Sequence, residues 1–159
     1  MPVIKLITHI NAAPEIVFDL SRSVDLHKIS TAHTQEEVVA GRTAGLIEQG
    51  ESVTWRAKHL GITQTLTSVV TEYNRPYNFT DVMLSGAFAG FKHDHIFEHK
   101  GKMTVMTDVF DYTSPYKLIG RIADTLFLKD YMRALLEKRN AIIKEYAEDS
   151  NKHKKILQL

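Results

Sequence analysis

The stretch from Tyr116 to about Glu148 constrains the fold most, because it has the pattern of one long amphipathic helix. It contains no proline, and its single glycine, Gly120, lies near its start. Ser114 and Pro115 before it form a helix start signal. Its apolar side chains recur with the 3.6-residue period of a helix. They are Leu118, Ile119, Ile122, Leu126, Met132, Leu135, Leu136, Ile142, Ile143 and Tyr146. At ~1.5 Å per residue the helix would be roughly 45 Å long, so this stripe needs an equally long partner.

The preceding sequence predicts that partner as an antiparallel sheet. Segments rich in β-forming residues and separated by turn signals indicate strands. They span 3–10, 34–40, 52–60, 62–73, 77–84, 91–99 and 103–112. Two short helices are expected after the first strand, one opened by Pro14 and one at 24–30. Successive strands followed by a segregated helix are typical of the α+β class. A curved sheet of about seven strands, wrapped around the long helix, would bury the stripe and leave space between the two.

Composition limits the classes of partner. The 159 residues are expected to form a single domain over 1–159, with a solvated tail at 149–159. A net charge of +1 predicts no nucleic-acid partner. No apolar run reaches the ~20 residues of a membrane span, so stable membrane insertion is not expected. The absence of cysteine excludes disulfides and thiolate metal sites. The N-terminus lacks a secretory signal pattern, so a cytoplasmic location is expected; the oligomeric state is not predicted.

Neighbouring strands are predicted to bring histidine and aspartate among aromatic side chains. Successive side chains of a strand alternate between its faces, and the face that carries phenylalanine is expected to point inward. That inward set is Phe79, Asp81 and Met83 on 77–84, Phe91, His93, His95 and Phe97 on 91–99, and Met106, Asp108 and Phe110 on 103–112. Buried charges must be paired or hydrogen-bonded, so a His–Asp pairing is expected.

These patterns resemble the START-like superfamily. This is the helix-grip fold shared with the birch-pollen allergen and polyketide cyclase-like proteins (SRPBCC). The similarity spans about residues 3 to 148 and is carried by Ala13-Pro14-Glu15, Arg56-Ala57, Gly61, residues 93–97, residues 108–112 with Pro115, and Arg139. The resemblance implies a cavity between the sheet and the C-terminal helix that receives apolar or amphipathic ligands. It implies no common catalytic motif.

Three interpretations of the histidine and aspartate set stay open. The side chains could form a structural polar network, orient a ligand's carbonyl or hydroxyl group in an apolar pocket, or act chemically. In the chemical case, His93 or His95 with Asp108 or Asp81 would be the general acid and base of a polyketide cyclase/dehydratase-like enzyme. The His-x-His spacing also suits a metal, for which an aspartate could be a third ligand, but no third ligand follows at a fixed spacing, so neither a metal nor a cofactor is expected.

Binding without chemistry is the preferred hypothesis. The predicted partner is a small hydrophobic or amphipathic ligand, held between the sheet and the C-terminal helix. Its contacts are expected from Trp55, Phe79, Asp81, Met83, Phe91, His93, His95, Phe97, Met106, Asp108, Phe110 and Ile122. The resemblance places the cavity beside the N-terminal half of the helix, near Ile122 rather than Ile143. By alternation His59 would share the face of Trp55 and Ala57, but at the end of its strand it is expected to face solvent rather than to serve the site. Arg139 is expected to extend along the helix edge, with a buried pairing to a cavity carboxylate as the alternative.

Overall fold

The computed structural model describes residues 2–114 and 127–159. One sheet has seven antiparallel strands in the order β1-β7-β6-β5-β4-β3-β2. The strands are β1 (Val3–Ile10), β2 (Glu37–Gly41), β3 (Ser52–His59), β4 (Ile62–Asn74), β5 (Asn78–Ser85), β6 (Gly90–Lys100) and β7 (Met103–Thr113). The helices are α1 (Pro14–Ser21), α2 (Val24–Ser30), the 3-10 turn η1 (Ala32–Thr34), α4 (Lys129–Glu148) and α5 (Ser150–Leu157). The predicted α+β class, with its antiparallel sheet and two short helices after the first strand, is confirmed.

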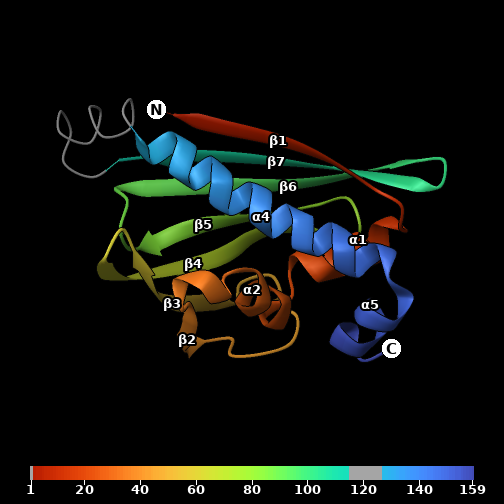
Figure 1. Ribbon diagram of the computed structural model, residues 1–159, viewed down its shortest axis with the longest axis horizontal. Helices are drawn as coiled ribbons and strands as arrows, with labels where there is room; N and C mark the ends of the chain where they lie inside the picture. The colour runs from red at the N-terminus through yellow and green to blue at the C-terminus, as the bar shows by residue number, and fades with distance from the viewer. Residues whose placement is uncertain (1, 115–126) are drawn as a thin grey trace.

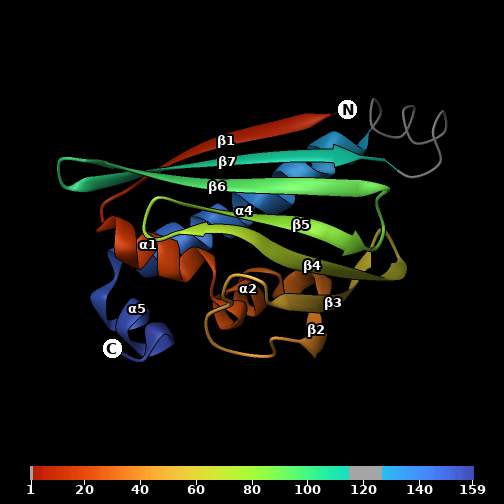
Figure 2. The ribbon, with the colours of Figure 1, turned by 180° about the vertical axis from the view of Figure 1, so that it is seen from behind.

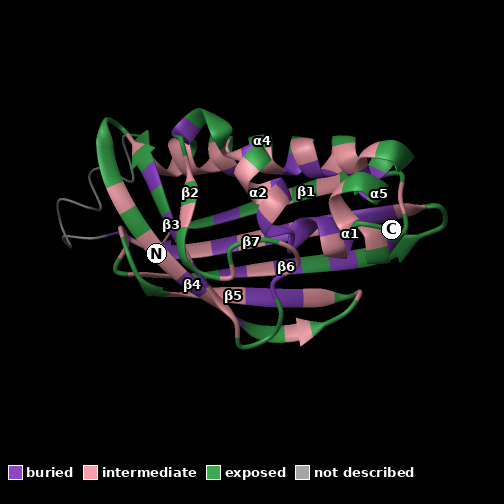
Figure 3. Ribbon diagram, turned by 90° about the horizontal axis from the view of Figure 1, so that it is seen from below, coloured by how far each residue is buried: buried purple, intermediate pink, exposed green. Residues whose placement is uncertain are grey.

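Helix α4 crosses one face of the sheet (Figure 1). From behind, strands β5, β6 and β7 lie in front of α4 (Figure 2). Viewed from below, α4 and the sheet form two layers (Figure 3). The predicted long helix is observed from Lys129 to Glu148. The rest of the prediction, from Pro115 through residue 126 and including Ile122, lies outside the described residues.

Local sequence signals set the ends of the first two helices. Pro14 occupies the first turn of α1, where its missing N–H costs nothing. Ser23 caps α2, because its hydroxyl oxygen accepts a hydrogen bond from the backbone N–H of Leu26 at 3.2 Å. Helix α1 packs against β6, β7 and α4, and α2 packs against α4.

The expectation of a solvated tail at 149–159 is wrong, because these residues form α5. The Asp149 carboxylate accepts hydrogen bonds from the backbone N–H groups of Asn151 and Lys152 and so caps the helix. His153 is buried, and Ile156 packs against the main core. The many lysines of this segment concealed a short amphipathic helix whose apolar side chains follow the helical spacing.

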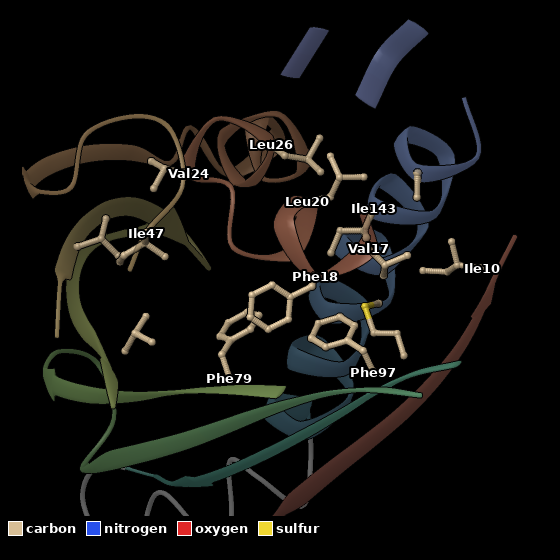
Figure 4. Packing of buried hydrophobic residues seen from close by; sticks show 14 of the residues in the cluster. Ile10, Val17, Phe18, Leu20, Val24, Leu26, Ile47, Phe79, Phe97 and Ile143 are labelled. Atoms are coloured by element: carbon tan, nitrogen blue, oxygen red, sulfur yellow. The ribbon is translucent and has the colours of Figure 1, made fainter. Parts of the chain in front are cut away.

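The main core lies under the C-terminal half of α4. The ring of Phe18 meets the rings of Phe79 and Phe97 edge to face, with 5.3 Å between centroids in both pairs. Ile143 of α4 joins this packing (Figure 4). Met106 of β7 belongs to the same cluster. Edge-to-face aromatic pairs add to the stabilisation from burial alone, so this end of the molecule is solidly packed.

Candidate functional site

A cavity of about 350 Å³ lies between the sheet, α2 and α4. Its wall is mainly apolar and draws on several elements. Prominent apolar members are Trp55, Leu66, Phe88, Phe91, Phe110 and Leu135. This is the size and character of a pocket for a small organic ligand.

The strand register brings four of the predicted polar residues to one place. Across β5 and β6, Asp81 pairs with His93, and across β6 and β7, His95 pairs with Asp108. Together with Arg139 from α4, their side chains form what we call the Asp108 cluster, which consists of Asp81, His93, His95, Asp108 and Arg139. The predicted inward orientation is observed for His93, His95 and Asp108, all of which are buried.

Within the Asp108 cluster, hydrogen bonds run from the imidazoles to the carboxylates. His93 Nε2 lies 3.1 Å from Asp108 Oδ1, and His95 Nδ1 lies 2.7 Å from the same oxygen. His95 Nε2 lies 3.0 Å from Asp81 Oδ1. The other Asp108 oxygen accepts a hydrogen bond from Asn140 Nδ2 at 2.7 Å. The predicted His–Asp pairing is therefore present, with Asp108 as the shared acceptor.

These contacts fix the protonation states. Burial alone would raise the pKa of Asp108, but the hydrogen bonds from His93 and His95 hold that pKa well below its ordinary value. Burial would likewise raise the pKa of Asp81, and the His95 contact lowers it overall. Burial acts to lower the pKa of His95, but its bonds to two carboxylates raise it. Since ionised carboxylates only accept hydrogen bonds, His95 with both ring nitrogens bonded is an imidazolium.

His93 behaves differently from its neighbour. Burial and the positive charge on His95 lower the pKa of His93. The two rings are 3.8 Å apart between centroids. Two imidazolium ions at that separation would repel each other in a medium of low dielectric constant. The cluster therefore holds one charged and one neutral imidazole.

Arg139 does not extend along the helix edge as expected. Its side chain is 11% exposed, and Nη1 lies 3.7 Å from Asp108 Oδ1. Nη2 donates a hydrogen bond to the backbone oxygen of Ser21 at 2.8 Å. Arg139 also forms part of the cavity wall. The alternative of a buried pairing with a carboxylate is the one observed.

A second group of polar side chains lies elsewhere in the cavity wall. We call it the Glu36 cluster, and it consists of His27, Glu36, His59 and Tyr131. The ring of His27 lies 4.3 Å from that of Trp55 between centroids, and its Nε2 is 3.4 Å from Glu36 Oε1. His59 Nδ1 lies 2.9 Å from the Tyr131 hydroxyl. The expectation that His59 faces solvent is therefore wrong.

The Glu36 cluster carries one carboxylate. Burial would raise the pKa of Glu36, but its contacts with His27 and Thr31 lower it overall. Burial lowers the pKa of His59 and so favours its neutral form. Sequence reasoning missed this cluster, because its members come from α2, the segment before β2, β3 and α4. No spacing along the chain connects them.

The other predicted site residues divide into two groups. Trp55, Phe79, Asp81, Phe91, His93, His95 and Phe110 lie in the cavity wall. Phe97 and Met106 lie in the packed core instead. Asp108 is fully buried and does not line the cavity, but it is hydrogen-bonded to His93 and His95, which do. Met83 is not part of the cavity wall. Ile122 lies outside the described residues.

The Asp108 cluster also contains three potential metal ligands. One ligand atom each from Asp81, His93 and His95 can be chosen within 4.8 Å of one another. Ligand atoms around a tetrahedral zinc at ~2.0–2.1 Å would be only about 3.4 Å apart. Both ring nitrogens of His95 already face carboxylates. These residues fit a hydrogen-bonded network better than a metal centre, and the expectation of no metal stays a prediction.

With this geometry in view, similar structures place the fold. A protein from Thermus thermophilus matches with a TM-score of 0.69 at 20% identity, over 89% of this chain and 97% of that one. A START superfamily protein from Mycobacterium smegmatis matches with a TM-score of 0.67 at 9% identity, over 90% and 97%. Ginseng major latex-like protein 151 from Panax ginseng matches with a TM-score of 0.65 at 15% identity, over 92% and 99%.

The chain has the START-like helix-grip fold. At these identities the similarity shows the fold alone. No protein-family description and no curated protein sequence matches the chain. Among the described residues, no helix is long and apolar enough to cross a membrane.

Proposed function

We propose that this protein binds a small hydrophobic or amphipathic ligand in the cavity between the sheet and α4. The observation that carries the proposal is the cavity itself, about 350 Å³ in volume, with an aromatic and aliphatic wall and a few polar groups. Ligand sites combine such a wall with a small number of placed polar side chains that fix orientation. The START-like fold, which commonly encloses a ligand cavity, supports the same conclusion.

Trp55 provides a direct test. It is the only tryptophan of the chain, it is 6% exposed, and it lies in the cavity wall. A ligand that enters the cavity should change the fluorescence of this residue in a saturable way. Native mass spectrometry of freshly purified protein should also reveal a co-purified apolar molecule that denaturation releases. Saturable binding of apolar dyes with no change in Trp55 fluorescence would place binding elsewhere and contradict the proposal.

A second candidate function is general acid–base catalysis on a bound carbonyl compound. The specific observation is that Asp81 opens to the cavity with a side chain that is 21% exposed, while His95 links it to buried Asp108. A carboxylate supported by an imidazolium in this way is positioned to exchange a proton with a ligand. A cyclase- or dehydratase-like reaction would need such a pair as its general acid and base.

The two candidates separate by substitution of Asp81. For an enzyme, Asp81→Asn should abolish conversion of a poly-β-ketone model compound while the compound still binds. For a binding protein, no conversion occurs with either form. Asp94→Asn is the control, because Asp94 lies on the neighbouring strand and bonds to Thr80 and Lys92, away from the cavity.

A further inference from the structure

We propose that the ligand is a neutral apolar molecule with a hydroxyl group at each end, which binds the Asp108 cluster with one end and the Glu36 cluster with the other. This inference rests on the proposed binding function and names its ligand class. The mainly apolar cavity has two separate polar clusters. A ligand with a single polar end would contact only one of them.

Unsatisfied polar atoms mark both clusters. Among the described residues, the buried side-chain atoms without a hydrogen-bond partner are His27 Nε2, Arg42 Nε, Arg139 Nη1 and Asn140 Oδ1. His27 and Arg139 belong to the cavity wall, one in each cluster, and these two atoms approach carboxylate oxygens only loosely, at 3.4 Å from Glu36 and 3.7 Å from Asp108. A buried polar atom without a full hydrogen bond is unfavourable, because it has lost its hydrogen bonds to water. A ligand oxygen at each end of the cavity would remove that cost.

The charges of the Asp108 cluster select a neutral group. Asp81 and Asp108 are ionised, and Arg139 with the His95 imidazolium balances them. A ligand carboxylate would add a third negative charge in a buried site, which is unfavourable. A hydroxyl suits the cluster, because its oxygen accepts from Arg139 while its hydrogen is donated to Asp81. A fatty acid is therefore a poor fit.

The Glu36 cluster also favours a hydroxyl. The lowered pKa of Glu36 keeps a carboxylate in the cavity wall, and this group accepts hydrogen bonds only. A ligand hydroxyl can donate to Glu36 and accept from His27 or Tyr131. The close, tilted contact between the rings of His27 and Trp55 holds the imidazole in place, so the cluster is organised before a ligand arrives.

The distance between the clusters suits a rigid body of two or three rings. Asp81 of the Asp108 cluster pairs with Val70 of β4, and Trp55, whose ring contacts His27 of the Glu36 cluster, pairs with Leu66 of β4, so these two positions mark the Asp81 and His27 ends of the cavity. These β4 positions are roughly 13 Å apart at ~3.3 Å per residue, and β3 and β5 flank β4 at about 4.8 Å each. The backbones of Trp55 and Asp81 are thus separated by roughly 16 Å on a flat sheet, and the side chains shorten this span.

A matched series of stilbenes tests the proposal through Trp55 fluorescence. The probes are trans-stilbene, para-hydroxystilbene, para,para′-dihydroxystilbene and para-carboxystilbene. Each hydroxyl that reaches a charged partner should tighten binding about tenfold. We expect the dihydroxy compound to bind about tenfold more tightly than the monohydroxy compound. The carboxylate should bind no more tightly than trans-stilbene.

Substitutions assign each hydroxyl to its cluster. Glu36→Gln and Asp81→Asn should each weaken binding of the dihydroxy compound about tenfold and leave trans-stilbene unchanged. Glu37→Gln is the matched control for the first, because Glu37 is exposed and pairs with Arg56. Asp94→Asn is the control for the second. If Glu36→Gln fails to fold, Tyr131→Phe removes a hydroxyl from the same cluster and keeps the ring.

The outcomes distinguish this inference from the proposed function. Equal affinities for trans-stilbene and the dihydroxy compound would overturn the inference and leave apolar binding intact. Tightest binding of para-carboxystilbene would overturn it in favour of an anionic ligand. No Trp55 response to any of the four probes would contradict the proposed function itself.

Discussion

The two halves of α4 lie over very different surroundings. Ile143 and Ala147 in the C-terminal half are buried in the main core, against α1 and the sheet. Tyr131, Met132 and Leu135 in the N-terminal half line the cavity. One apolar stripe therefore lies on the packed core at one end and on the cavity, the proposed ligand site, at the other. The Asp108 cluster lies at the boundary, where Asn140 connects the middle of α4 to β7.

The largest effect is expected at this boundary. Asp108→Asn removes the anion that His93 and His95 share, and leaves buried positive charge without its partner. Loss of one member of a buried pair costs about 3–5 kcal/mol, and denaturant unfolding would measure it. Asp111→Asn, on the outward face of the same strand, is the control. A loss below about 1 kcal/mol would show that Asp108 does not hold the two halves together.

The pairing of Asp108 also predicts how the free energy of unfolding changes at acid pH. Because the folded-state pKa of Asp108 lies below its ordinary value of 3.8, its stabilisation is fully present above that value. It is lost as the pH falls through the folded-state pKa. Below about pH 4, wild-type stability should fall more steeply than that of Asp108→Asn. If the stability of the wild type and of Asp108→Asn fell equally steeply with pH, the pairing of Asp108 with the histidines would be contradicted.

The next effect concerns the packed half. Ile143→Ala should reduce the free energy of unfolding by about 2–5 kcal/mol, because the surrounding core cannot collapse into the space. Ligand affinity at the cavity should stay the same. A matched pair of measurements, denaturant unfolding and a Trp55 fluorescence titration, checks both parts.

A smaller loss of stability is expected in the cavity half. Leu135→Ala should cost less than about 2 kcal/mol, because its side chain already faces empty space and has fewer contacts to lose. Binding of an apolar ligand should weaken about tenfold from the lost contact area. Equal stability losses in Leu135→Ala and Ile143→Ala, with unchanged binding in both, would mean that α4 lies on one continuous core.

The smallest effect concerns α5, beyond the packed half. Asp149→Ala removes the cap of this helix and should cost about 0.5–2 kcal/mol. Ligand affinity should not change, because α5 packs on α1 and α4 rather than on the cavity. Asn151→Ala, at an exposed position of the same helix, is the control. No difference between these variants would restore the expectation of a solvated tail.

The sequence by itself determined the strands, the short helices and the inward face of β6. Alternation and caps act between neighbours in the chain, so Phe79, His93 and Asp108 could be assigned to inward faces before the fold was seen. The expectation of a cavity came from the resemblance to START-like proteins. Sequence patterns also placed Phe97 and Met106 inward, but could not separate the filled part of the interior from the hollow part.

Only the tertiary structure decided which polar groups meet. Glu36, His59 and Tyr131 come from separate elements, and their approach depends on how the sheet curves and where α4 crosses it. Arg139 was ambiguous for the same reason, since a position on a helix does not fix the depth of its side chain. Periodicity reports the direction in which a side chain points, whereas a cavity is a property of the space between elements, which no local pattern encodes.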